Sequence, residues 1–300
     1  MAQATADDGT LIHYQDKGPT KGPGETILFL HEYGGDPRSW EPQVAAFART
    51  HRCLVPATRG YLPSGIPGDA DAYSYEIVAE DARAVLDDAG VETAHVVGLS
   101  MGAYTGLMLS LRHPGRVATL TAASGGSGSH PEINPAFRDE AAGLADAMLA
   151  AGTFPADDFA NGPTRLQLKR KDLPAWEKFR DELAEHDVTG AAHVLRNIVG
   201  GRPSLYTFAD QLAALTTPIL FLVGDEDDGV LDINLWLKRT MPGAGMEMVP
   251  KSGHLLNLED PAGFNAAVAH FHETVAEGGW PLRDMSTVGF GGGAPAQVNE

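Results

Sequence analysis

Short apolar runs alternate with segments of helical periodicity from residue 26 onwards, and this alternation limits the fold more than any other feature. An apolar run without intervening polar positions is typical of a strand buried on both faces, as in a parallel sheet covered by helices. The sequence therefore predicts an α/β fold, with a mainly parallel central β-sheet and helices on both faces. The expected strands are Thr26–Leu30, Cys53–Ala57, His95–Leu99, Val117–Ala122, Pro218–Val223 and Met246–Val249.

Helices are expected between these strands, because capping residues stand where the helical patterns begin. The last helix has the clearest start, since an N-cap aspartate is followed by proline at the first helical position. The expected helices run from Ser39 to about Thr50, from Ser74 to Gly90, over Met101–Arg112 and from Asp260-Pro261 onwards.

The alternation is interrupted once. Residues 124–215 have helical patterns and turn residues but no convincing strand. An insert at this point would lie over the carboxyl ends of the strands, where open α/β sheets bind ligands. We expect a core formed by residues 1–123 and 216–278, a helical cap formed by residues 124–215, and a loosely attached tail over residues 279–300, which holds Gly291-Gly292-Gly293.

Charge and cysteine content exclude several kinds of protein. A formal charge of −18 argues against nucleic acid or an anionic membrane as a partner, since both require a basic surface. Cys53 is the only cysteine, so a disulfide framework, a cysteine-based zinc site and a CxxC redox pair are excluded. Residues 1–10 lack the features of a signal peptide, and no apolar run approaches the ~18 residues of a membrane span. A cytoplasmic enzyme is expected; oligomeric state is not indicated.

The segment Gly98-Leu99-Ser100-Met101-Gly102 has the pattern GxSxG, between an expected strand and an expected helix. A serine on such a sharp turn projects above the sheet, and small neighbours are needed because backbone passes close by. GxSxG alone occurs often by chance, and Ser100 could be a simple N-cap. Its position between strand and helix favours a nucleophile.

A nucleophilic serine needs a base, and the base needs an acid to orient it. The strand Pro218–Val223 runs into four consecutive acids at positions 225–228, one of which is the expected partner. Of the eleven histidines, only His254 lies on a strand-end loop after these acids, in the chain order serine, acid, histidine.

These motifs together resemble the α/β-hydrolase superfamily, specifically its capped, esterase-like members. The resemblance implies that Asp227, the fourth residue of the Gly224 segment, is the acid. It also implies that the backbone N–H groups of Tyr33 and Met101 form an oxyanion hole. The matching segments are His31-Glu32-Tyr33-Gly34-Gly35, Arg59-Gly60-Tyr61, Gly98-Leu99-Ser100-Met101-Gly102, Gly224-Asp225-Glu226-Asp227 and Ser252-Gly253-His254.

One position departs from the family. Glu32 stands where such proteins usually carry glycine, and a carboxylate there would oppose the developing oxyanion unless it points away, is protonated or is paired. We expect Glu32 to turn from the site and hydrogen-bond a neighbouring loop, with contact to the substrate as the alternative. Glu32 and Gly34 are thus candidate substrate-binding residues, and His31 is expected to hold the loop.

Two weaker signals lie in the expected cap. A basic stretch could guide an anionic substrate, although such a run is more often a solvated helix face. Four aromatic residues could line an acyl pocket or simply pack the cap on the core. The basic residues are Arg165, Lys169, Arg170, Lys171, Lys178 and Arg180, and the aromatic residues are Trp176, Phe179, Tyr206 and Phe208.

The sequence as a whole predicts a serine hydrolase that cleaves a small to medium carboxylic ester or lactone through an acyl-enzyme. Ser100, Asp227 and His254 would form the triad, and neither a metal nor an organic cofactor is required. A C–C bond hydrolase or a cofactor-free perhydrolase could use the same triad. A non-catalytic ligand-binding protein of the same fold is the alternative outside enzymes.

Overall fold

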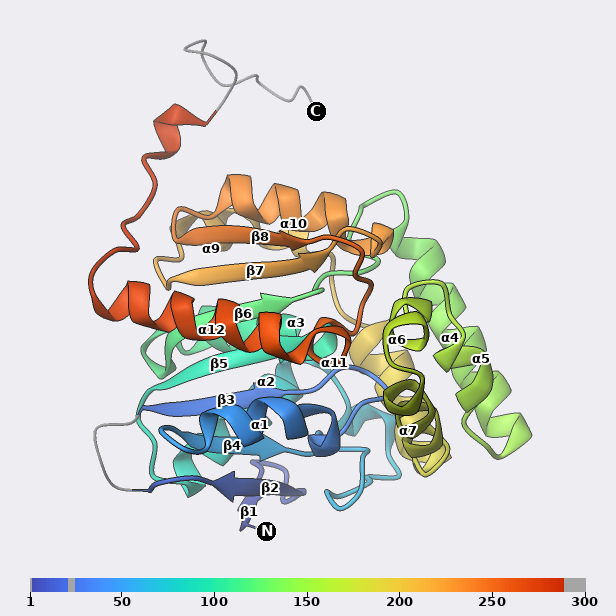
Figure 1. Ribbon diagram of the computed structural model, residues 1–300. Coiled ribbons are helices and arrows are strands. Elements are labelled where there is room, and N and C mark those ends of the chain that lie inside the picture. Colours follow the sequence, from blue (N-terminus) through green and yellow to red (C-terminus); the bar gives the residue numbers. More distant parts are fainter. Residues whose placement is uncertain (1, 21–24, 289–300) are drawn as a thin grey trace.

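A single eight-stranded sheet forms the centre of the protein, in the order β1-β2-β4-β3-β5-β6-β7-β8 (Figure 1). The computed structural model describes residues 2–20 and 25–288. The pairs β1–β2 and β2–β4 are antiparallel, whereas every pair from β4 to β8 is parallel, as predicted. The strands are β1 (Ala2–Thr5), β2 (Leu11–Lys17), β3 (Thr26–Leu30), β4 (Arg52–Pro56), β5 (Ala94–Leu99), β6 (Val117–Ala123), β7 (Ile219–Gly224) and β8 (Ala244–Val249).

All six expected strands are present, with ends within two residues of the prediction. The central strands β5 and β7 are buried at every position, which explains why they lack polar alternation. The strands β1 and β2 were not predicted. They form an antiparallel edge, and in β2 the residues Ile12 and Tyr14 are buried between more exposed neighbours.

Helices cover both faces of this sheet, as predicted. One face packs on α1 (Glu41–Phe47), α11 (Leu256–Glu259) and α12 (Pro261–Ala276), with Trp40, Phe264 and Phe271 in its core. The opposite face packs on α2 (Tyr75–Asp88), α3 (Met101–Arg112), α9 (Ala209–Ala214) and α10 (Asp228–Thr240). Short 3₁₀ helices occur at Pro37–Trp40, Ala70–Ala72, Pro114–Arg116, Leu205–Phe208 and Met285–Thr287.

Two of the predicted helix caps are confirmed and one is wrong. The side chains of Ser74 and Asp260 accept backbone N–H groups at the starts of α2 and α12. Ser39, in contrast, lies inside a 3₁₀ turn that Asp36 caps, and its hydroxyl accepts the Asp36 N–H. The two side chains form a reciprocal capping box, so the N-cap comes three residues earlier than predicted.

A group of helices lies at the carboxyl ends of the strands, on the right of Figure 1. We call them the insert helices; in the described chain the segment 124–215 contains no strand, in agreement with the prediction. Leu205 and Leu212, near the end of this segment, instead pack in the core on the side of α10. The insert helices are α4 (Asn134–Ala151), α5 (Ala156–Ala160), α6 (Leu166–Lys171), α7 (Leu173–Leu183) and α8 (Val188–His193), which a π-helical segment, Val194–Val199, continues.

The first residues of the carboxyl-terminal tail are attached to the core, contrary to expectation. The Trp280 ring packs on Phe271, with ring centroids 4.6 Å apart, and its indole N–H donates to the Gly243 carbonyl. Residues 289–300, including the three consecutive glycines, lie outside the described residues. Among the helices of the described chain, none has both the length and the apolar character that a membrane crossing requires.

Candidate active site

The predicted site residues meet at the carboxyl edge of the sheet. Ser100 follows β5, Asp227 follows β7 and His254 follows β8, while Glu32 follows β3. Because parallel strands end at the same edge, loops that are far apart in the sequence meet there. The structure thus places the loops that carry these four residues at one edge of the sheet.

Ser100 occupies a strained turn between β5 and α3. Its φ of 53° and ψ of −107° lie in a region that side-chain-bearing residues rarely adopt. A Cβ at Gly98 would lie 2.3 Å from the Gly102 carbonyl oxygen, and one at Gly102 would lie 2.0 Å from the Leu30 oxygen. Both glycines of the motif are therefore required by close backbone contact, which confirms the reason given for them.

Asp227 and His254 form a buried hydrogen bond. The Asp227 Oδ2 lies 2.7 Å from His254 Nδ1, and both residues are buried. An ionised carboxylate only accepts, so Nδ1 donates and a neutral ring has its lone pair on Nε2. No hydrogen bond joins this ring to the Ser100 hydroxyl in the described chain; such contacts often tighten only with substrate bound.

The other three acids of the cluster have different surroundings. Asp225 accepts the Ser252 N–H at 3.3 Å, and Glu226 accepts the Gln167 amide at 3.0 Å. Asp228 is exposed at the start of α10. Of these four acids, only Asp227 hydrogen-bonds to the imidazole.

A second carboxylate, which the sequence analysis missed, holds the loop of His254. Glu259 accepts the N–H groups of Gly253 and Leu255, on either side of the histidine, at 3.1 and 3.2 Å. The Lys171 ammonium lies 3.0 Å from Glu259 and compensates its charge. Nothing in the sequence distinguished Glu259 from an ordinary acid before a helix.

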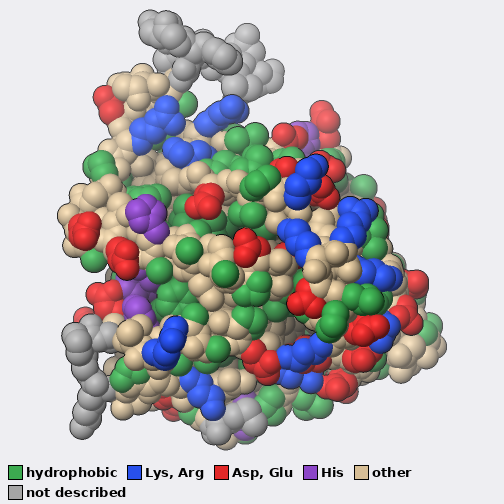
Figure 2. All heavy atoms as spheres, viewed as in Figure 1, with side chains coloured by type: hydrophobic (Ala, Val, Ile, Leu, Met, Phe, Trp, Pro, Cys, Tyr) green, Lys and Arg blue, Asp and Glu red, His purple; other side chains and the backbone are tan. Residues whose placement is uncertain are grey.

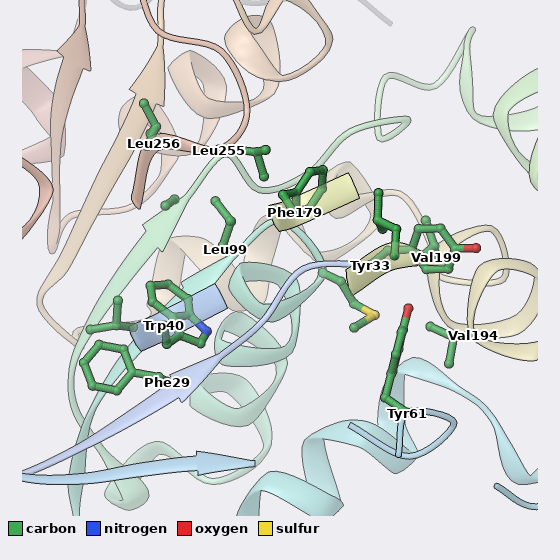
Figure 3. Packing of buried hydrophobic residues seen from close by; sticks show 14 of the residues in the cluster. Phe29, Tyr33, Trp40, Tyr61, Leu99, Phe179, Val194, Val199, Leu255 and Leu256 are labelled. Carbon is green, nitrogen blue, oxygen red and sulfur yellow. The ribbon is translucent and has the colours of Figure 1, made fainter. Parts of the chain in front are cut away.

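The amides implied for an oxyanion hole are available. Neither the Tyr33 nor the Met101 N–H has a hydrogen-bond partner within the part of the chain that the structure describes. Met101 begins α3, so the positive end of the helix dipole adds to its N–H. The Tyr33 side chain belongs to the same buried cluster as Phe179 and Val199 (Figure 3).

Glu32 does not turn from the site, contrary to expectation. Its Oε2 lies 3.6 Å from His254 Nε2, the ring nitrogen opposite Asp227, and 2.8 Å from a terminal nitrogen of Arg165. The Glu32 side chain is only 1 % exposed, and that of Arg165 is 13 % exposed. Pairing with the guanidinium compensates a carboxylate that would otherwise be costly at this position.

The neighbours of Glu32 have structural contacts. His31 Nδ1 donates to the Glu32 carbonyl at 2.7 Å, while its Nε2 accepts the Thr58 N–H at 3.0 Å. Burial lowers the pKa of His31 to about 4, so it is neutral near pH 7 and holds two loops together, as expected. Gly34 has a φ of 79°, and its carbonyl accepts from the His186 ring of the insert. Gly34 thus lies in the contact between core and insert.

A cavity of about 350 Å³ opens beside the site, between the loop after β3 and the insert helices. Its wall is mainly apolar. Tyr33 and Arg165 connect it to the site, because the first carries one of the two amides implied for an oxyanion hole and the second pairs with Glu32. The lining residues are Tyr33, Glu140, Leu144, Met148, Phe154, Pro155, Asp158, Phe159, Gly162, Arg165 and Leu195.

None of the four aromatic residues proposed for an acyl pocket lines this cavity. Trp176 and Phe179 are buried in the packing of the insert, and the Trp176 N–H donates to the Ala160 carbonyl. The Tyr206 ring packs on Trp236 of α10, with ring centroids 4.3 Å apart. These contacts agree with the second interpretation of the aromatic residues, in which they pack the cap and the core and do not line an acyl pocket.

The basic stretch is largely neutralised by nearby acids. Figure 2 shows positive and negative side chains intermixed on the face that carries α6 and α7. Lys171 pairs with Glu259, Lys178 with Glu41, and Arg180 with Asp181. Of the six basic residues only Arg165 lines the cavity, so the stretch forms no continuous positive surface around it.

Known proteins resemble the chain along nearly its whole length. The family model described as alpha/beta hydrolase fold matches residues 25–261. The putative carbamate hydrolase RutD of Caulobacter sp. (strain K31) is 27% identical over 281 residues, which cover 90% of this chain and 98% of the relative. The 3-oxoadipate enol-lactonase 1 of Acinetobacter baylyi is 26% identical over 90% of this chain and 96% of its own.

Solved structures agree with this assignment. The crystal structure of a hydrolase from Pseudomonas aeruginosa PA01 superposes with a TM-score of 0.79 at 25% identity, and covers 90% of this chain and 97% of that one. Its name, like those of the two relatives, describes a hydrolase. The chain therefore belongs to the α/β-hydrolase fold family, and the relatives support an enzyme of the hydrolase class.

Proposed function

We propose that this protein is a serine hydrolase that cleaves a small to medium carboxylic ester or lactone through an acyl-enzyme. The observation that carries the proposal is the 2.7 Å contact between Asp227 and His254 at the edge of the sheet where the strained Ser100 turn lies. A carboxylate, an imidazole and a serine on neighbouring strand ends are the parts that nucleophilic acyl transfer requires.

In the first half-reaction, the Ser100 oxygen attacks the ester carbonyl carbon while His254 Nε2 takes the hydroxyl proton. Asp227 accepts from Nδ1, which fixes the tautomer and stabilises the imidazolium. The carbon–oxygen bond to the alcohol then breaks, and His254 returns its proton to the leaving oxygen. A water molecule repeats the sequence on the acyl-enzyme, with His254 as its base.

The negative charge of the tetrahedral intermediate falls on the former carbonyl oxygen. The free N–H groups of Tyr33 and Met101 are the donors that we assign to this oxygen. Each such donor contributes about 10²- to 10³-fold to kcat in serine hydrolases. The charge of Glu32 would oppose the oxyanion, and its pairing with Arg165 at 2.8 Å reduces this effect.

The substrate class follows from the cavity and from the relatives. A largely apolar space of about 350 Å³ suits a small to medium acyl chain or ring. One relative is named as a lactonase and another as a carbamate hydrolase, and both names describe cleavage next to a carbonyl group. We infer that the insert helices act as a cap that closes over this substrate.

A panel of p-nitrophenyl esters and lactones of increasing chain length tests the proposal. We expect turnover by the wild type and a loss on the order of 10⁶ in kcat for Ser100→Ala, with folding retained by circular dichroism. Ser286→Ala, an exposed serine in the 3₁₀ helix Met285–Thr287, is the matched control and should keep wild-type rates. If no ester or lactone is turned over, the alternative of a non-catalytic ligand-binding protein is favoured. Turnover of C–C substrates alone would favour a C–C bond hydrolase, and formation of peracids alone would favour a perhydrolase.

A further inference from the structure

Arg165 is the one residue of the basic stretch that reaches the cavity. Its guanidinium carbon lies 4.0 Å from the centre of the Phe159 ring, and a terminal nitrogen lies 2.8 Å from Glu32. The ring and the carboxylate together fix the plane and the direction of the guanidinium. A charged donor that is held in this way is already arranged to bind a ligand.

The guanidinium has donors that the described chain does not use. Its five N–H groups make one hydrogen bond, from a terminal nitrogen to Glu32, and the buried Nε has no partner among the described residues. Buried donors in folded proteins are nearly always paired, so this donor at the wall of a cavity is available to an acceptor on a ligand.

The charges around the cavity indicate which acceptor fits. Glu32 already compensates Arg165, and two further carboxylates, Glu140 and Asp158, line the cavity as exposed residues. The whole chain carries a formal charge of −18. An anionic group would meet net repulsion here, whereas an uncharged carbonyl or amide oxygen accepts a hydrogen bond without adding charge.

We propose that Arg165 is a specificity-determining residue that donates a hydrogen bond to an uncharged oxygen acceptor on the acyl part of the substrate. This inference rests on the proposed ester or lactone hydrolysis. Glu32 Oε2 lies 3.6 Å from His254 Nε2 and 2.8 Å from a terminal nitrogen of Arg165, so the guanidinium is close to the catalytic histidine. An acceptor a few bonds from the reacting carbonyl can therefore reach it. Glu32 acts as a positioning residue, because it holds Arg165 in place.

Matched ethyl esters that differ in one group separate the alternatives, with acid release followed in a pH-stat. Ethyl 4-oxopentanoate, monoethyl succinate and ethyl 4-methylpentanoate have nearly the same shape and end in a ketone, a carboxylate and an apolar branch. Ethyl 5-oxohexanoate, monoethyl glutarate and ethyl 5-methylhexanoate repeat the comparison one carbon further away. We expect kcat/KM for the better ketone ester to exceed that of its apolar match by about tenfold, and its carboxylate match to be the poorest of the three.

The variants test whether Arg165 causes this preference. Arg165→Met should reduce the ketone-to-apolar ratio of kcat/KM to about one, while Arg165→Lys should retain part of it. Glu32→Gln combined with Arg165→Met removes both charges, and is the second variant if the single one does not fold. Arg170→Met is the matched control; Arg170 is 68 % exposed on α6, the short helix that begins directly after Arg165, and the ratio should stay at the wild-type value.

The outcomes distinguish this inference from the proposed function. A wild type that hydrolyses these esters without preferring a ketone, or that prefers a carboxylate, contradicts the role of Arg165 and leaves the hydrolase in place. An Arg165→Met protein that keeps the ketone preference likewise contradicts the role of Arg165 and leaves the proposed hydrolase activity untouched. A wild type that hydrolyses neither these esters nor the p-nitrophenyl panel contradicts both.

Discussion

The pair formed by Glu32 and Arg165 makes an asymmetric prediction about stability. Arg165→Met leaves a carboxylate that is only 1 % exposed without its partner, which should cost about 3 to 5 kcal/mol of unfolding free energy. Glu32→Gln leaves the guanidinium, which is 13 % exposed at the edge of a cavity that water can enter, so we expect a smaller loss of about 1 to 2 kcal/mol. The double variant should lose about 1 to 2 kcal/mol, because no charge remains uncompensated.

Urea unfolding of the four proteins, followed by tryptophan fluorescence and circular dichroism, measures the interaction energy of the pair directly. The exposed pair Lys178 and Glu41 is the matched control, with side chains 51 % and 57 % exposed, and its interaction energy should stay below about 1 kcal/mol. Additive losses at Glu32 and Arg165, or equal losses for the two single variants, would refute the argument from burial.

Asp227→Asn should lower kcat in ester assays by about 10³ to 10⁴, whereas Asp228→Asn, at the exposed neighbouring position, should lower it less than about tenfold. The reverse order would show that Asp228, and not Asp227, is the acid of the triad. Gly102→Ala places a Cβ 2.0 Å from a backbone oxygen and should lower the free energy of unfolding in urea by about 3 kcal/mol or more. The control Gly143→Ala, which has open space around it on α4, should be neutral or stabilising, and similar unfolding midpoints for the two variants would contradict the close approach. Burial raises the pKa of the Cys53 thiol to about 12, so the folded protein should not react with Ellman's reagent at pH 8 and should react once when unfolded in urea; fast labelling of the folded chain would disprove this.

The sequence predicted the parallel core well because burial on both faces leaves a direct pattern. Strand β3 runs from Thr26 to Leu30 as expected, and α3 has the predicted ends. Both elements consist of near-continuous apolar residues bounded by clear turn signals. The N-caps Ser74 and Asp260 were predictable for a similar reason, since their side-chain contacts are local.

The amino-terminal strands were missed because they lie at the edge of the sheet. In β2 the buried positions Ile12 and Tyr14 alternate with polar or partly exposed residues, and Leu11 is exposed. This alternation is a strand signal, but it is short and differs from the apolar runs of the core. Helix α10 received no assignment either, although Val230, Ile233 and Leu237 have helical spacing and are buried.

Ser100 and His254 were readable because each follows a predicted strand, whereas the choice of Asp227 among four neighbouring acids came from the resemblance to the family. The surroundings of Glu32 were not readable, since its partner Arg165 is 133 positions away and looks like the five other cations of the basic stretch. The tertiary fold decides which of these cations turns toward the cavity. The contacts of Glu259 to the His254 loop depend likewise on the path of the loop between β8 and α11, which local patterns do not specify.

Labelling with a fluorophosphonate tests the central claim most directly, because this reagent forms a stable bond only with an activated serine. After incubation, proteolysis and mass spectrometry locate the adduct, and residual ester hydrolysis is measured on the same sample. We expect one adduct per chain, on Ser100, with activity lost in proportion to labelling and much slower labelling of Asp227→Asn. An adduct on another residue, or full activity after Ser100 is modified, would contradict it.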